Sequence, residues 1–366
     1  MLPDMLPADA DDHAILFLPG PTEVDAELRA IMAEPLVGHR SAAFVAVVQD
    51  VCRRLRDVFL SAQPAAFETC AATALMEAAI RNLVPPGGRT LHLVAGAFGE
   101  RWQQIAAACG RRTDADVVPL GCAHSAATLR ERLRQGPAVD AVCITHNETA
   151  TGVLEPLAEL AAVVRAEAPA ALVLVDVVTS LAGAEVRFDD WGLDFAFAGT
   201  QKCLALPPGL CVYTASERAV ARAATVPDRG FLLDLPRALR ETNAGKTIAT
   251  PCVPLVAALQ RQLQRVAAEG LPERWRRHAA LRDATLAWAA AAGMAPFVAT
   301  PAHRSPTVSC IDARGRDVAA LAARARDSGF RIDQGYGPLQ GKAFRIGHMG
   351  DHDLPRLHAL LTALGT

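Results

Sequence analysis

Apolar and polar residues alternate along the chain in blocks that predict alternating strands and helices. The expected strands are short, almost wholly apolar runs of the type that helices cover on both faces, at residues 89–95, 139–146, 171–178, 193–199 and 210–215. The helices expected among them carry apolar residues at helical spacing, at residues 73–84, 99–110 and 157–168. This order of elements predicts an α/β layered fold with a mostly parallel sheet.

The pattern changes beyond about residue 254, where two long helical stretches at 254–270 and 271–293 lead into a smaller unit. In that unit we expect two strands and two helices, at residues 307–313, 316–329, 343–349 and 351–365. The chain is therefore divided into an N-terminal segment (1–25), a large domain (26–269) and a smaller C-terminal α/β domain (270–366).

Composition favours an enzyme that handles a small molecule. The formal net charge is −2, from 37 basic and 39 acidic residues, so the chain has no electrostatic footprint for nucleic acid or a membrane surface. The first twelve residues are acidic and lack the order of a signal peptide, and no apolar run is long enough to span a bilayer. The nine cysteines show no zinc spacing. We expect a cytoplasmic protein with reduced thiols and no metal.

Lys202 is the first candidate for chemistry. It follows the apolar run 193–199 after a short turn and precedes the bend Pro207-Pro208-Gly209. Loops at the carboxyl ends of strands are where α/β proteins place their sites. A lysine in a loop is usually a solvated surface residue, but the neighbours of Lys202 are almost wholly apolar. A buried lysine is costly unless its charge is paired or changed, and a Schiff base is one use of such a lysine.

Asp176 ends another strongly apolar run, and an aspartate there either caps the following turn or holds a cation in a dry pocket. The protonated ring nitrogen of pyridoxal phosphate (PLP) is one such cation, because its positive charge lets the cofactor act as an electron sink. Asp176 and Lys202 lie 26 residues apart, enough for one strand-crossing unit. We therefore expect both residues at the same edge of the sheet.

Further motifs extend this picture through nearly the whole chain: LPGPTEV (18–24), HNETATGV (146–153), LVDVVTSL (174–181), GTQKCLALPPG (199–209) and FRIGHMG (344–350). With these motifs in this order, the chain resembles the class V aminotransferases, and most of all the alanine–glyoxylate and serine–pyruvate aminotransferases. The resemblance implies the aspartate-aminotransferase-like PLP fold type I, a homodimer, and PLP as cofactor. It also implies transfer of an amino group from a small amino acid (alanine or serine) to a 2-oxo acid (glyoxylate or pyruvate).

Position by position, the resemblance also implies the roles of single residues. Lys202 is the Schiff-base lysine and Asp176 the partner of the pyridine nitrogen. Phe98 is implied to stack on the cofactor ring, and Thr149, or Thr151 in its place, to bring a hydroxyl near the ring oxygen. Gln201 is implied to donate to the phosphate, and the backbone of Gly20 to line the substrate pocket. Arg345 matches the arginine that grips the substrate carboxylate, for which a guanidinium fork is well shaped. His39, Arg40 and His348 lie in matching motifs without an assigned chemical step.

The cofactor phosphate is expected at the start of the helix near Thr73, where free backbone N–H groups and the helix dipole favour an anion. The family's Gly-Ser-Gly-Thr-like run reads Cys70-Ala71-Ala72-Thr73 here. Ala72 leaves the backbone donors available, but the serine hydroxyl is missing. Phosphate binding is therefore expected to depend on Thr73, Gln201 and a second subunit. Thr250 matches a position that reaches the phosphate of the partner in a dimer.

Three other functions remain as alternatives. A PLP-dependent lyase or desulfurase would use the same lysine–aspartate pair, but a desulfurase needs a mobile catalytic cysteine, and none here lies in an obvious loop. A nucleotide-binding oxidoreductase would need a GxGxxG turn, a spacing that Gly96-Ala97-Phe98-Gly99 lacks. A non-catalytic binding protein is disfavoured because Lys202, Asp176 and Arg345 are all present.

Overall fold

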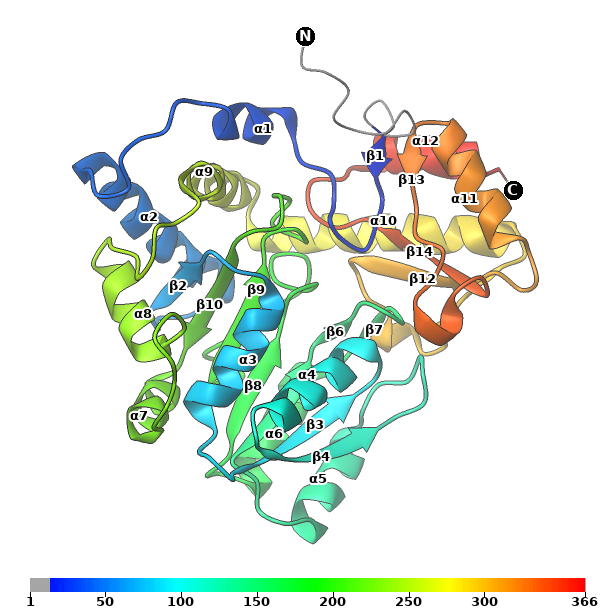
Figure 1. Ribbon diagram of the computed structural model, residues 1–366. Helices are drawn as coiled ribbons and strands as arrows, with labels where there is room; N and C mark the ends of the chain where they lie inside the picture. Colours follow the sequence, from blue (N-terminus) through cyan, green and yellow to red (C-terminus); the bar gives the residue numbers. More distant parts are fainter. Residues whose placement is uncertain (1–13, 366) are drawn as a thin grey trace.

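The computed structural model describes residues 14–365, and a seven-stranded sheet lies at its centre (Figure 1). Its strands are β2 (Ala65–Glu68), β3 (Arg89–Val94), β4 (Arg112–Val117), β5 (Ala141–Thr145), β8 (Leu172–Asp176), β9 (Phe195–Gly199) and β10 (Cys211–Ala215). They are arranged in the order β2-β10-β9-β8-β5-β3-β4. All neighbours are parallel except β10, which is antiparallel to both β2 and β9. The expectation of a mostly parallel sheet is confirmed.

Helices cover both faces of this sheet, which explains why its strands are apolar on both sides. On β5, Val142 and Ile144 join the core on one face, and Ala141 and Cys143 join the core on the other. The first face is covered by α2 (Ala42–Phe59), α5 (Ala126–Gln135), α6 (Leu157–Glu167) and α9 (Val253–Glu269). The second is covered by α3 (Ala72–Leu83), α4 (Ala97–Ala108), α7 (Glu217–Thr225) and α8 (Leu235–Asn243).

The C-terminal part is built around a second, antiparallel sheet of three strands, in the order β11-β12-β14. Its elements are α10 (Leu271–Ala291), β11 (Ala295–Pro296), β12 (Val308–Asp312), α11 (Val318–Asp327), β14 (Ala343–Gly347) and α12 (Leu354–Leu364). The short strand β1 (Ile15–Leu16) pairs in parallel with β13 (Phe330–Arg331), so the start of the described chain joins this C-terminal part. The expected domain boundary at residues 269–270 falls between α9 and α10 and stays a prediction.

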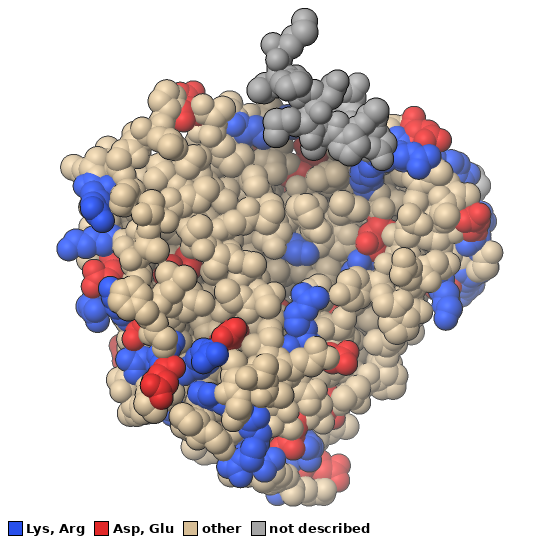
Figure 2. Space-filling view, in the orientation of Figure 1, with Lys and Arg blue, Asp and Glu red and all other residues tan. Residues whose placement is uncertain are grey.

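The remaining elements are short: the helix α1 (Ala26–Met32), the hairpin β6 (Asn147–Glu148) and β7 (Val153–Leu154), and the 3-10 turns η1 (Pro301–His303) and η2 (Gly337–Leu339). Throughout residues 14–365, no helix is both long and apolar enough to cross a bilayer. Basic and acidic side chains lie interspersed on the face shown in Figure 2. Of the N-terminal segment expected at 1–25, residues 1–13 lie outside the described part of the chain.

The register of the central strands determines where their loops open. Thr145 on β5 lies opposite Asp176 on β8, and Asp176 lies opposite Phe197 on β9. Because the three strands are parallel, the segments that follow them leave the sheet at the same edge. The site described below is built at this edge.

Candidate active site

Lys202 lies three residues beyond the end of β9, in the turn that the sequence predicts. Its ammonium donates a hydrogen bond to the carbonyl oxygen of Pro19. Gly20 has a positive φ of 114°, and a Cβ atom at this position would overlap the Lys202 side chain. Burial, and then the nearby charge of Arg345, lower the pKa of Lys202 to about 8. The amine is therefore close to the range in which it both accepts and gives up a proton.

Asp176 is the last residue of β8 and is 4% exposed. Its Oδ1 accepts a hydrogen bond from the backbone N–H of Val178 at 2.8 Å, so one oxygen caps the turn. Among residues 14–365 its other oxygen accepts no hydrogen bond. Burial raises the pKa of this carboxyl to about 7. A cation bonded to the free oxygen would favour the charged form.

Phe98 lies in the first turn of α4, and a buried acid fixes its backbone. The carboxylate of Glu148, from β6, accepts hydrogen bonds from the N–H groups of Phe98 at 2.9 Å and Gly99 at 3.3 Å. Gly96 permits this close approach, since a Cβ there would lie 2.6 Å from Cγ of Glu148. Sequence reasoning missed Glu148, although an acid inside the HNETATGV motif was a signal for it.

Arg345 is the central residue of β14 and is 5% exposed. Its Nε donates to Oδ1 of Asp333 at 2.7 Å, and its Nη1 donates to the carbonyl oxygen of Thr149 at 2.8 Å. The hydroxyl of Thr149 is itself hydrogen-bonded to that of Thr179 at 2.6 Å. The guanidinium of Arg345, from the C-terminal sheet, is thus held in a fixed orientation against the backbone between β6 and β7.

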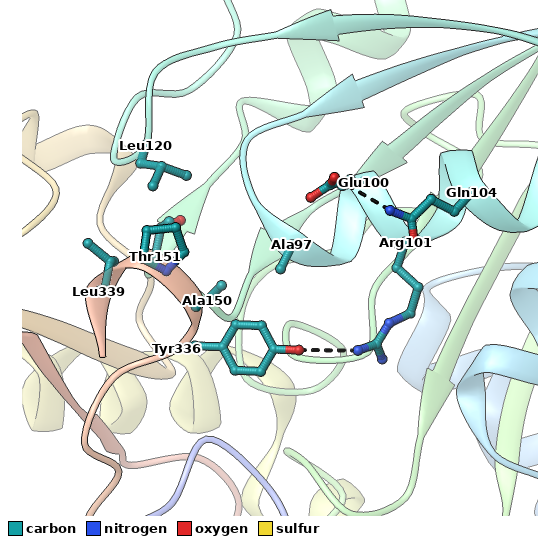
Figure 3. Close-up of a pocket in the computed structure, with 11 residues that line it drawn as sticks. Ala97, Glu100, Arg101, Gln104, Leu120, Ala150, Thr151, Tyr336 and Leu339 are labelled. Carbon is teal, nitrogen blue, oxygen red and sulfur yellow. Dashed lines mark hydrogen bonds between the residues drawn. The ribbon is translucent and has the colours of Figure 1, made fainter. Parts of the chain in front are cut away.

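The mouth of the site lies between α4 and the loop that contains η2. A cavity of about 310 Å³ opens there, with Ala97, Arg101, Thr151, Tyr336 and Leu339 among its lining residues (Figure 3). Nη2 of Arg101 donates to the hydroxyl of Tyr336 at 3.3 Å, and the Arg101 guanidinium lies 5.0 Å from the Phe98 ring centre. The rings of Phe98 and Tyr336 are 6.1 Å apart and inclined by 26°.

The start of α3 is the expected phosphate end of the site. Its N-cap residue Ala71 makes no side-chain capping bond, so the backbone donors at Ala72 and Thr73 are not satisfied by a cap. Gln201, beside Lys202, is half-buried. An anion fits here, because the first turn of this 12-residue helix presents backbone N–H groups that no side chain caps.

Thr250, which was expected at the cofactor phosphate, does not line the cavity beside α4. Thr250 is exposed and lines a separate cavity of about 480 Å³ with His39, Arg40 and residues 245–249. His348, by contrast, is buried, and its Nε2 bonds to the Ser309 hydroxyl at 3.0 Å. Within residues 14–365, no cluster of three or more histidine, cysteine or acidic residues is arranged to hold a metal ion.

The residues at the sheet edge fit PLP. A buried carboxylate with one free oxygen suits a pyridinium nitrogen, an amine with a lowered pKa suits covalent attachment, and an uncapped helix start suits a phosphate. These features, on a mostly parallel sheet followed by a smaller α/β part, define a PLP enzyme of fold type I.

Known proteins agree with this class. Residues 37–338 match the Aminotransferase class-V family. An uncharacterized aminotransferase of Methanocaldococcus jannaschii is 36% identical over 348 residues, which cover 92% of this chain and 88% of that protein. The serine–glyoxylate aminotransferase of Methylorubrum extorquens is 32% identical, with 95% and 89% covered. The crystal structure of an alanine–glyoxylate aminotransferase from a Nostoc species superposes with a TM-score of 0.91 at 30% identity, covering 98% and 96%. The chain belongs to the class V aminotransferase family and is a PLP-dependent transaminase.

Proposed function

We propose that this enzyme moves the amino group of a small amino acid, alanine or serine, to a small 2-oxo acid, glyoxylate or pyruvate. The observation that carries the proposal is the buried guanidinium of Arg345, whose charge acts on Lys202 and whose Nη2 donates no hydrogen bond within residues 14–365. A second cation, Arg101, lines the cavity beside α4, where it contacts the Phe98 ring and the Tyr336 hydroxyl, and we propose that it does not bind a second substrate carboxylate. The names of the serine–glyoxylate and alanine–glyoxylate relatives support the same choice, whereas an L-aspartate–glyoxylate aminotransferase that is 30% identical to this chain uses a dicarboxylic donor.

The roles of the residues follow from their surroundings. When bound, PLP supplies the electron sink that makes the α-proton of the amino acid acidic. Lys202, with its lowered pKa, would take that proton from the α-carbon onto Nζ as general base and would give it up again from Nζ before the keto product forms. Asp176 holds the proton on the ring nitrogen, and Arg345 orients the substrate carboxylate so that the α-hydrogen faces Lys202. With the cofactor bound, Phe98 would stack on its ring, and Thr149 would bring a hydroxyl near its ring oxygen.

The phosphate end is proposed to use the backbone at Ala72 and Thr73 together with the Gln201 side chain. Gly20 contributes by its backbone, since its lack of a side chain leaves room for Lys202 to move.

The test is a matrix of amino donors against 2-oxo acceptors with the purified holoenzyme. Alanine and serine with glyoxylate should give the highest kcat/KM, and aspartate and glutamate much lower values. A dicarboxylic donor would bring a second, unpaired charge into the site, which is costly in a desolvated pocket. Glutamate as the best donor would contradict the proposal. The Lys202→Ala variant is the blank for non-enzymatic exchange.

The alternative of a lyase or desulfurase is less well supported. Eight of the nine cysteines are buried or half-buried. The ninth, Cys122, is exposed in the loop before α5, so the expectation that no cysteine lies in an obvious loop was wrong. The same matrix decides between these reactions: a desulfurase would release sulfide from cysteine without any 2-oxo acid, whereas a transaminase forms its keto product only when an acceptor is present.

We further propose that the enzyme is a cytoplasmic homodimer in which Thr250 reaches the cofactor phosphate of the partner. Leu36 is 70% exposed and Val37 is 48% exposed, and in the chain a single residue separates them from His39 and Arg40, which line the same cavity as Thr250. The capless start of α3 gives the phosphate few side-chain partners within one chain. The nine free thiols suit a reducing compartment. Light scattering on the holoenzyme should give the mass of two chains.

A further inference from the structure

Arg345 is buried, and its guanidinium forms an ion pair with Asp333; its charge also lowers the pKa of the buried carboxyl of Glu148, to which no hydrogen bond from Arg345 is found among residues 14–365. Asp333 lies opposite Arg345 across a short antiparallel bridge, in which each residue's N–H donates to the other's carbonyl oxygen, at 3.1 and 2.9 Å. The two side chains meet as well, with Nε of Arg345 donating to Oδ1 of Asp333 at 2.7 Å. A buried guanidinium needs such a partner, because an unpaired buried charge is strongly destabilising.

Asp333 is itself held in place. Its Oδ1 also accepts a hydrogen bond from the N–H of Gly335 at 2.8 Å. Gly335 has a φ of 93°, and a Cβ there would come within 2.5 Å of the carbonyl oxygens of Ala343 and Leu339. The turn after Asp333 therefore accepts only glycine without distortion, and it aims the carboxylate at Arg345.

These contacts determine which edge of the guanidinium is free. Of its five N–H donors, one on Nε goes to Asp333 and one on Nη1 goes to the carbonyl oxygen of Thr149. The Tyr336 ring covers one face, with its centre 5.4 Å from Cζ of Arg345. Within residues 14–365, the N–H groups left without a partner are one on Nη1 and two on Nη2, so a carboxylate can be bound at this end edge of the guanidinium and not at Nε.

We propose that Asp333 is a positioning residue for substrate binding: it fixes Arg345 so that this end edge, and not the Nε edge, receives the α-carboxylate of the amino acid. The inference rests on the proposed function for the identity of the bound carboxylate. It gives Asp333 two separable effects. The hydrogen bond to Nε sets the orientation of the guanidinium. The negative charge of Asp333 competes with the substrate carboxylate for the positive charge of Arg345 and so weakens substrate binding.

Two substitutions separate these effects. Asp333→Asn keeps an oxygen acceptor for Nε and removes the charge, so a substrate carboxylate should bind as tightly as in the wild type or a few times tighter. Asp333→Ala removes both, so the guanidinium loses its orientation and the carboxylate should bind about tenfold or more weakly. Asp312→Ala is the matched control, because Asp312 ends the neighbouring strand β12 and its side chain bonds to the N–H of Arg314.

The probe is 2-methylalanine, which has an amino group and an α-carboxylate but no α-hydrogen for Lys202 to remove. Titrating it into each holoenzyme while following the cofactor's absorbance gives a Kd that does not depend on turnover. In parallel, Asp333→Ala should raise the KM for alanine while kcat changes less than the KM does. Thermal unfolding of each cofactor-free variant reports whether the substitution merely loosens the fold.

Wild-type affinity in Asp333→Ala would overturn the inference, and so would equal weakening in the Asn and Ala variants, since asparagine keeps the acceptor. A loss of affinity that Asp312→Ala reproduces would also overturn it. Failure of the proposed function looks different: the wild type would bind 2-methylalanine, and the two Asp333 variants would still differ, but no amino group would pass from alanine or serine to glyoxylate.

Discussion

The carboxylate of Glu148 binds the backbone of Phe98 and so ties the β6–β7 hairpin to the first turn of α4. One oxygen accepts from the N–H groups of Phe98 and Gly99, and the other accepts from the N–H of Ala150 at 2.9 Å. Glu148 is 1% exposed, and burial raises its pKa while these hydrogen bonds lower it. An acid at a helix N-terminus also interacts favourably with the helix dipole. Glu148 therefore fixes the backbone that carries the Phe98 ring, and it can do so without contacting the cofactor.

Glu148→Gln tests this arrangement. The amide nitrogen cannot accept a hydrogen bond, so at least one N–H is left without a partner, and the free energy of unfolding should fall by about 1–3 kcal/mol. Cofactor binding should weaken as well, because Phe98 is less well placed. Thermal unfolding and a PLP titration measure both effects. Glu100→Gln is the control, because Glu100 also lies in the first turn of α4 but does not bond to the Phe98 backbone; it should change neither stability nor PLP affinity. Equal losses in both variants would mean that the loss of negative charge near the start of α4, and not the hydrogen bonds of Glu148, causes the effect.

Lys202 should be the site of covalent cofactor attachment. Borohydride reduction of the holoenzyme followed by peptide mapping should place the label on Lys202, and the chain has only two other lysines, Lys246 and Lys342, both exposed. Lys202→Ala should bind PLP without a covalent bond and lose activity by a factor on the order of a thousand or more, since both the attachment and the general base are gone. Label on Lys246 or Lys342 would refute the assignment.

Asp176→Asn should keep the fold and lose activity about a hundredfold or more, because a neutral amide no longer stabilises positive charge on the ring nitrogen. Steady-state kinetics with saturating PLP provide the measurement. Near-normal turnover would leave Asp176 with only its bond to the Val178 N–H, that is, with a capping role.

The same residue predicts a pH dependence in the cofactor-free protein. Burial raises the pKa of Asp176 from 3.8 to about 7, so between these values the folded chain binds more protons here than the unfolded chain does. The contribution of Asp176 to stability is therefore greatest below pH 4 and is lost as the pH rises towards 7. The wild type should become less stable relative to Asp176→Asn over this range, as measured by denaturant unfolding at several pH values. Parallel curves for the two proteins would contradict the raised pKa.

Thr250→Val should weaken PLP binding about threefold to tenfold while the dimer stays intact, the size expected for one lost hydrogen bond. PLP titration and light scattering measure these two quantities. Thr225→Val is a suitable control, because Thr225 is exposed at the end of α7 and its hydroxyl bonds to its own helix. Full cofactor occupancy in a monomeric protein would contradict the role of Thr250.

Local sequence was enough to predict the central elements. The runs 171–178 and 193–199 are apolar except at Asp176 and Asp194, as a strand covered on both faces requires, and they appear as β8 and β9. The helix expected from Thr73 is α3, which begins one residue earlier. The edge strands β2 and β4 were not predicted: β4 reads RTDADV and is half-exposed, so it lacks the continuous apolar signal of its neighbours.

The sequence by itself also predicted a lysine and an aspartate after apolar strands, and the resemblance to the class V aminotransferases implied their roles toward the cofactor. The structure shows that these strands, β8 and β9, are parallel neighbours. Only the tertiary structure decided which groups surround the two residues. Glu148 reaches the Phe98 backbone from 50 residues away, and Asp333 meets Arg345 across a bridge whose register no local pattern specifies. Such contacts depend on how separate elements pack and on which backbone groups remain unpaired after packing. A periodic pattern of apolar residues reports that a side chain is buried, but it does not report the partner.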